Sequence, residues 1–145
     1  MYHIEQIDRI HFPLVKKFYQ AFYPSGKPNK ADPIWVLKHG QKILSAVRFK
    51  QLEQVQLLTA MVTEPNHRGQ GLAQQLLAQL ADVIATVDCY CFALPYLEGF
   101  YQQHGFHSIH PETLPLALYQ RFQAYSKNGR ALLPMQHRPT NLTPD

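Results

Sequence analysis

A glycine-rich turn lies near the middle of the chain, in the stretch His67-Arg68-Gly69-Gln70-Gly71-Leu72-Ala73. The residues before it, 54–63, alternate like a strand, and residues 72–84 carry apolar side chains at helical spacing. Unpaired backbone N–H groups converge at the start of a helix, and the helix dipole adds partial positive charge there. Because glycines let the backbone approach a ligand closely, this turn is a candidate site for a phosphate group.

Two widespread phosphate-binding motifs do not fit this turn. The dinucleotide fingerprint needs a third glycine where Gln74 stands, and the P-loop needs a lysine directly after Gly71. The string does fit the pattern Arg-x-x-Gly-x-Ala, at Arg68, Gly71 and Ala73. On these residues alone, a turn that only starts a helix is an open alternative.

The bulk composition is that of one ordinary globular domain. The chain has 145 residues, of which 46% are hydrophobic and 17% are charged. No apolar run approaches the ~18 residues that span a bilayer, and residues 1–12 lack the apolar region of a signal peptide. We therefore expect a single domain over residues 1–136, a flexible tail over residues 137–145, and a cytoplasmic protein without membrane contact.

The charge of the chain gives little information about its partners. The formal net charge is +4, and it is not gathered in a block of lysines and arginines. A modest positive charge is compatible with phosphate-bearing ligands, but it does not by itself favour nucleic acid as a partner.

Neither the cysteines nor the histidines indicate a metal site. Cys89 and Cys91 stand two apart in a strand-like run, where they share a face with poor geometry for a disulfide. We expect both to be buried free thiols. Three histidines, His104, His107 and His110, straddle a glycine turn without a carboxylate at ligand spacing, so we expect no metal.

Strand-like and helical patterns alternate along the chain, with a hairpin pattern in the first half. The predicted strands cover residues 3–9, 34–38, 43–49, 54–63, 86–94, 106–109 and 131–136. The predicted helices cover residues 13–22, 72–84, 96–104 and 116–126. This order predicts an α/β protein with a mixed sheet and helices on both faces.

A second motif follows the glycine-rich turn, in the stretch Phe100-Tyr101-Gln102-Gln103-His104-Gly105-Phe106. It reads as a short helix ended by glycine and followed by a strand. The two motifs, in this order and with a helix and a strand between them, resemble the core of the GNAT acetyltransferase superfamily. The resemblance covers residues 54–109, and it implies a mixed, mostly antiparallel central sheet of six to seven strands flanked by helices.

The resemblance implies acetyl-CoA as the acyl donor, with no metal. The turn would hold the pyrophosphate through backbone N–H groups. A bulge in the preceding strand would offer a backbone N–H near Met61 or Val62 to the thioester carbonyl. The residues expected to bind the cofactor are Met61, Val62, Thr63, Arg68, Gly69, Gln70, Gly71, Leu72 and Ala73.

The resemblance places Tyr101 at the position of the general acid that protonates the departing thiolate. A tyrosine with a pKa of about 10 holds its proton at neutral pH; a packed aromatic ring on a short helix is the structural alternative. No base is assigned, because Glu53 and Glu64 flank the long strand and each is equally explained as a solvated charge. Neither motif contains a cysteine, so we expect direct transfer in a ternary complex rather than an acyl-cysteine route.

The acceptor is the least determined part of this interpretation. The resemblance implies that the first helix and the loop 22–33 line its site, where Lys27 and Lys30 would favour an acidic acceptor and Asp32 could orient an amine. A basic surface loop is the alternative. We expect acetyl transfer to a primary amine of a small molecule or peptide. A non-catalytic acyl-CoA sensor, a toxin-like acetyltransferase acting on aminoacyl-tRNA, and a homodimer through residues 116–126 stay open.

Overall fold

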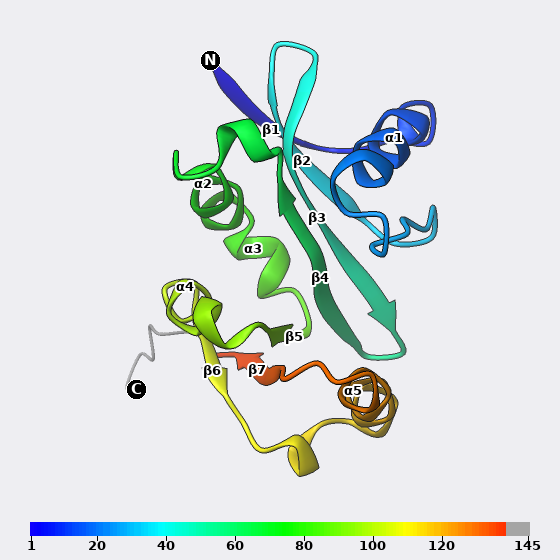
Figure 1. Ribbon diagram of the computed structural model, residues 1–145, viewed down its shortest axis with the longest axis vertical. Helices are drawn as coiled ribbons and strands as arrows, with labels where there is room; N and C mark the ends of the chain where they lie inside the picture. Colours follow the sequence, from blue (N-terminus) through cyan, green and yellow to red (C-terminus); the bar gives the residue numbers. More distant parts are fainter. Residues whose placement is uncertain (139–145) are drawn as a thin grey trace. The chain divides into compact units, whose positions relative to one another are not determined.

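The computed structural model describes residues 1–138. Its seven strands follow the order β1-β2-β3-β4-β5-β7-β6 in one sheet, and five helices accompany them (Figure 1). This mostly antiparallel sheet confirms the predicted fold class. Contacts along the chain divide it into two compact units. The N-terminal unit comprises residues 1–51 and 58–81, and the C-terminal unit comprises residues 52–57 and those from 82 onward.

The N-terminal unit carries most of the first four strands, together with helices α1 and α2. Strand β1 pairs antiparallel with β2, and β2 pairs antiparallel with β3. Helices α1 and α2 lie on opposite sides of these strands (Figure 1). The elements are β1 (Tyr2–Gln6), α1 (Phe12–Phe22), β2 (Ile34–His39), β3 (Lys42–Leu52), β4 (Val55–Thr63), the 3-10 turn η1 (Pro65–His67) and α2 (Leu72–Gln79).

Helix α1 forms where its apolar residues recur at helical spacing. Pro13 stands in its first turn, where a missing N–H costs little, and Val15, Phe18 and Tyr19 are buried. These side chains pack against apolar residues of the strands, and the burial of each such side chain stabilises the fold by about 1.5–3 kcal/mol. The resulting core cluster consists of Phe12, Val15, Phe18, Tyr19, Ile34, Val36, Ile43, Ala46, Ala60 and Val62.

The helix expected over residues 72–84 is interrupted. Helix α2 ends at Gln79, and α3 (Ala81–Ile84) follows it. Between them the N–H of Leu80 donates to the carbonyl of Leu77, three residues back, at 3.0 Å. This tighter hydrogen bond closes the first helix, because an α-helix would use the carbonyl four residues back.

The C-terminal unit has β7 as its middle strand, paired antiparallel with β5 on one side and β6 on the other. Its small core joins Leu57, Tyr90, Leu114 and Leu118. The further elements are β5 (Asp88–Ala93), the 3-10 turn η2 (Pro95–Leu97), α4 (Glu98–Gln102), β6 (Phe106–Ser108), the 3-10 turn η3 (Pro111–Thr113), α5 (Leu116–Lys127) and β7 (Leu133–His137).

Several smaller expectations can be compared with this structure. Cys89 and Cys91 are buried free thiols, as predicted, and burial raises the pKa of Cys91 well above its ordinary value. No helix within residues 1–138 is long and apolar enough to cross a membrane. Of the tail expected to be flexible, residue 137 ends β7, and residues 139–145 lie outside the described residues.

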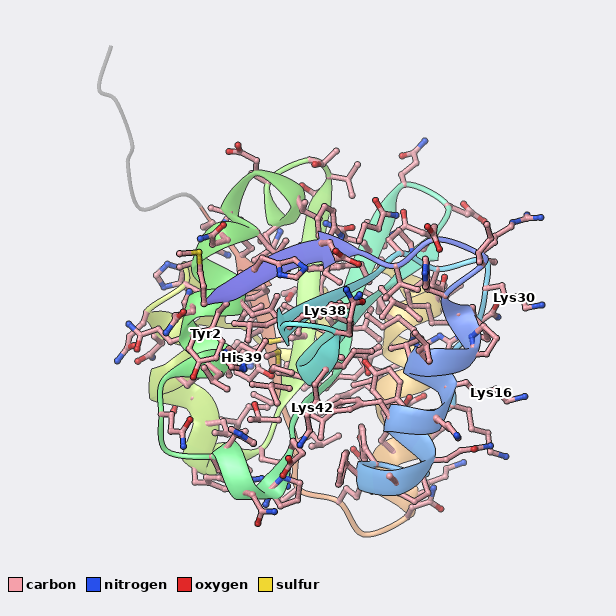
Figure 2. The ribbon with its side chains drawn as sticks, turned by 90° about the horizontal axis from the view of Figure 1, so that it is seen from above. Tyr2, Lys16, Lys30, Lys38, His39 and Lys42 are labelled. Carbon is pink, nitrogen blue, oxygen red and sulfur yellow. The ribbon has the colours of Figure 1, made fainter. Side chains whose placement is uncertain are left out.

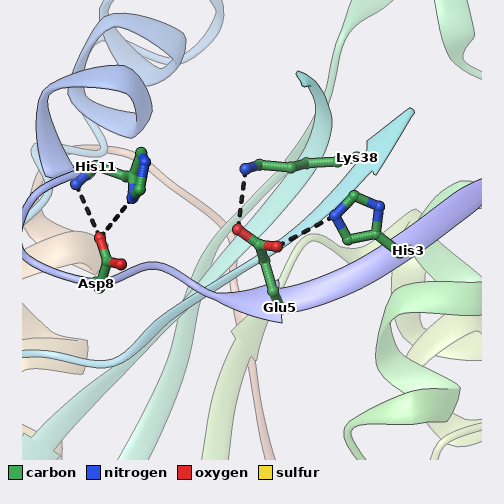
Figure 3. A network of polar contacts seen from close by, with 5 residues as sticks. All are labelled: His3, Glu5, Asp8, His11 and Lys38. Carbon is green, nitrogen blue, oxygen red and sulfur yellow. Dashed lines mark hydrogen bonds and ion pairs between the residues drawn. The ribbon is translucent and has the colours of Figure 1, made fainter. Parts of the chain in front are cut away.

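A partly buried ion pair ties β1 to β2 (Figure 3). The Lys38 side chain is almost fully buried, and its ammonium lies 2.9 Å from the carboxylate of Glu5. The other carboxylate oxygen of Glu5 lies 3.1 Å from the His3 ring. The hydrogen bond from Lys38 is the main reason that the pKa of Glu5 lies below its usual value.

We expect Glu5→Gln to lower the free energy of unfolding at pH 7 by about 1–2 kcal/mol, because it leaves the buried Lys38 charge without its counterion. The contribution of Glu5 is complete above its ordinary pKa of 4.5 and is lost as the pH falls through the lowered folded-state pKa. Urea unfolding of both proteins between pH 7 and pH 3 should show the difference shrinking below pH 4.5. His3→Gln is the control, with little expected effect. Equal stabilities at pH 7 would contradict the assignment.

Candidate active site

The glycine-rich turn leads from η1 into α2. Gly69 and Gly71 have φ angles of 80° and 77°, a left-handed conformation that glycine adopts readily and other residues rarely do. Gly71 is the N-cap of α2, and its carbonyl accepts the first helical hydrogen bond, from Gln75, at 3.0 Å. The backbone N–H groups that precede Gln75 in the first turn of α2 have no helical carbonyl four residues back to bond to. The turn therefore presents several donors at the positive end of a helix dipole.

Glu64 fixes the approach to this turn. Its side chain is buried, and its carboxylate accepts a hydrogen bond from the Asn66 N–H at 2.6 Å. The same carboxylate lies 3.1 Å from His67 Nδ1 and 3.4 Å from Lys42 Nζ. The bond from Asn66 is the main cause of a lowered pKa at Glu64. Glu64 is therefore an ionised cap rather than a solvated charge, and a lowered pKa does not suit a general base.

The expected cofactor residues of β4 are linked to the same turn. The Arg68 Nε donates to the carbonyl of Thr63 at 3.4 Å, so this side chain folds back onto the end of β4. The Ser45 hydroxyl of β3 lies 3.1 Å from both the Val62 carbonyl and the Thr63 hydroxyl. Of the predicted cofactor residues, the structure thus brings Arg68 against Thr63 within the N-terminal unit.

Strand β4 is distorted one residue before Met61. Ala60 has a φ of 53°, which costs a non-glycine residue about 1–2 kcal/mol. Its carbonyl accepts a hydrogen bond of 2.9 Å from the hydroxyl of Tyr19, which is 1% exposed. Burial raises the pKa of Tyr19, so the phenol keeps its proton and stays a donor at neutral pH. A helix side chain therefore satisfies a strand carbonyl at the distortion.

Tyr101 lies on α4 in the C-terminal unit and is 7% exposed. Its ring meets those of Phe100 and Phe106 edge to face, at centroid distances of 5.1 Å and 5.9 Å. Gly105 makes the turn between α4 and β6 with a φ of 91°, and a Cβ there would lie 2.9 Å from the His137 ring. Packing alone therefore explains why this second motif needs a glycine before Phe106.

Three polar residues of the N-terminal unit make contacts that the sequence patterns do not indicate. Tyr19 counted only as part of an apolar stripe, although a buried tyrosine usually needs a partner for its hydroxyl. Asp32 accepts a hydrogen bond from the Gln51 N–H at 3.1 Å and lies 3.9 Å from Lys50, so it ties the loop to β3. Arg48 is a charged residue within the apolar run 43–49, and this break in the pattern could have indicated a functional residue.

Comparisons with known proteins agree with this architecture. The chain is similar to an N-acetylglutamate synthase from Neisseria gonorrhoeae, solved with coenzyme A and N-acetyl-glutamate, with a TM-score of 0.69 and 14% identity over 97% of this chain. It spans only 36% of that synthase chain. It is also similar to the ribosomal-protein-S18-alanine N-acetyltransferase from Escherichia coli, with a TM-score of 0.67 and 15% identity over 99% of both chains.

A third similar structure is Arabidopsis thaliana Naa50 in complex with the bisubstrate analogue CoA-Ac-MVNAL, with a TM-score of 0.66 and 12% identity over 95% of this chain and 99% of that one. Identities this low show the fold alone. None of the curated protein sequences matches the chain significantly. A family profile described as an acetyltransferase (GNAT) domain matches residues 30–108, which is more than half of the chain. The chain therefore belongs to the GNAT acetyltransferase family.

Proposed function

We propose that this chain transfers the acetyl group of acetyl-CoA to a primary amine of a small molecule or peptide, in a ternary complex. The observation that carries the proposal is the turn at Gly69 and Gly71, which places two left-handed glycines at the start of α2 in a GNAT chain. Similar structures contain coenzyme A with N-acetyl-glutamate, or a bisubstrate analogue of coenzyme A and a peptide. They support this donor and this class of acceptor.

The donor site that we propose lies in the N-terminal unit. The backbone N–H groups of residues 69–73 would bind the pyrophosphate, helped by the dipole of α2 and by Arg68. Residues 61–63 would line the pantetheine arm. A backbone N–H of Met61 or Val62, next to the distortion at Ala60, would donate to the thioester carbonyl as its oxygen gains charge. Acetyl-CoA supplies the thioester that carries the acetyl group.

In the reaction, the neutral amine attacks the carbonyl carbon, the C–N bond forms and the C–S bond breaks. Tyr101 would give its proton to the departing thiolate, because a phenol is protonated at neutral pH. The proton lost by the amine leaves through a group that we do not assign, since Glu53 is exposed and Glu64 serves as a cap. Holding the reactants in place contributes much of the rate acceleration.

Gly71→Ala should weaken coenzyme A binding. Alanine at a φ of 77° costs about 1–2 kcal/mol, so the turn should move away from the geometry that presents its N–H groups, and the Kd for coenzyme A should rise about tenfold. Isothermal titration calorimetry measures this directly. Gly129→Ala is the matched control, because it has a φ of 81° and equally open surroundings but lies after α5. Equal effects of the two variants on Kd would argue against the proposed phosphate site.

Tyr101→Phe should lower kcat about 100-fold, the usual contribution of a general acid, and leave the Kd for coenzyme A unchanged. The assay follows free thiol from acetyl-CoA with a panel of amines, polyamines, amino acids and peptides. Tyr125→Phe, at a half-buried tyrosine that also has an edge-to-face ring contact, is the control. An unchanged rate in Tyr101→Phe would remove its assignment as acid. Binding without turnover for any amine would favour the sensor alternative, and no binding would overturn the whole proposal.

A further inference from the structure

A second polar cluster of the N-terminal unit takes no part in the proposed donor site. It consists of Tyr19 on α1, Tyr23 directly after α1, and Arg48 on β3. Arg48 stands opposite Ile34 in the β2–β3 register, and Ile34 packs in the core cluster that contains α1. Side chains of directly opposed residues share a face of a sheet. The Arg48 side chain therefore lies on the α1 face.

The guanidinium of Arg48 is only partly satisfied by the protein. One terminal nitrogen donates to the backbone carbonyl of Lys27. The Nε atom is buried and has no hydrogen-bond acceptor among residues 1–138. The carboxylate of Asp32 is paired with Lys50, at 3.9 Å, and no described carboxylate forms an ion pair with Arg48. A buried donor without an acceptor typically costs about 1–3 kcal/mol, and more when it is charged.

The neighbours of this cluster relate Arg48 to strand β4. Burial raises the pKa of Tyr19, the charge of Arg48 opposes that rise, and Tyr23 adds to it. Tyr19 in turn bonds to the carbonyl of Ala60. A Cβ at Gly26 would lie 3.3 Å from the Ala60 side chain, so the loop after α1 passes against the same residue. Gly26, which lies against the residue of the strand distortion, directly precedes Lys27, whose carbonyl accepts the hydrogen bond from Arg48.

The other basic side chains of this region differ from Arg48. Figure 2 shows Lys16 and Lys30 extending outward from α1 and from the loop after it. The Lys30 ammonium lies over the ring of Phe12 at 5.7 Å. Lys27 is exposed and contributes its backbone carbonyl, not its charge, to the cluster. Arg48 therefore provides the one guanidinium in this cluster.

We propose that Arg48 binds a carboxylate of the acceptor, so that this chain acetylates the amine of a free amino acid or another small amino carboxylate. The proposal rests on the proposed acetyl transfer and names its substrate class. The planar guanidinium matches a carboxylate in shape and charge. A phosphate group carries nearly twice the charge of a carboxylate, but here it would meet only one cation, next to a backbone carbonyl. The single cation therefore favours a carboxylate.

A binding experiment tests the anchor without turnover. The thermal unfolding midpoint is measured with each common α-amino acid and with its α-carboxamide, at about 10 mM, since a ligand that binds the folded state raises the midpoint. At least one free acid should raise the midpoint by more than its amide does. The difference should be absent in Arg48→Gln, reduced in Arg48→Lys, and retained in Lys27→Gln, which removes the same charge from the neighbouring loop.

Two results would overturn the anchor. One is that acid and amide behave alike for every pair in the unmodified protein. The other is that the difference persists in Arg48→Gln. Should Arg48→Gln fail to fold, the comparison of acid with amide in the unmodified protein and the Arg48→Lys variant still decide the matter.

An acetylation assay with the same pairs separates this inference from the proposed function. The kcat/KM for the free acid should exceed that for its amide by about 30-fold, the size expected for one charge-assisted hydrogen-bonded contact. If amides react as fast as acids, the chain is an acetyltransferase and the anchor is wrong. If nothing is acetylated but binding still distinguishes acid from amide through Arg48, the proposed function fails and the anchor stands.

Discussion

The hydrogen bond from the Tyr19 hydroxyl to the Ala60 carbonyl is the contact on which the N-terminal unit depends. Ala60 adopts a left-handed conformation that an alanine rarely tolerates. A carbonyl turned out of its strand must find another donor, because a buried polar group without a partner is costly. Tyr19 supplies that donor from α1. The packing of the helix and the distortion of the strand therefore stabilise each other.

The same principle continues along the chain from Ala60 to the glycine-rich turn. Two residues after Ala60, the Val62 carbonyl lies near the Ser45 hydroxyl. The N–H of Glu64 donates to the Leu44 carbonyl at 2.8 Å, and its carboxylate lies near Lys42. Each of these partners comes from the first half of β3. The segment that leads into the turn is thus held by one neighbouring strand, while the turn's own glycines keep left-handed conformations.

The sequence predicted well what depends on local signals. The glycine-rich turn, the order of the elements and most of their limits follow from periodicity and from glycine and proline positions. Contacts between distant residues were not predictable in this way. Tyr19 and Ala60 are 41 residues apart, and no pattern in either segment names the other. The burial of Glu64 and the break at Leu80 also depend on neighbours and on backbone geometry that a one-dimensional pattern does not contain.

Arg48 differs from the other buried or half-buried charged residues of the N-terminal unit, because its Nε atom has no acceptor among the described residues. Lys38 is a buried cation with its counterion, and Glu64 is a buried anion with three partners, so folding accounts for both. The opposing residue Ile34 and the neighbour Ala46 on the same face are apolar. An apolar residue at position 48 would match that face and would leave no buried nitrogen without an acceptor, whereas the half-buried Arg48 does. A residue that breaks the local pattern in this way is a candidate for a functional role.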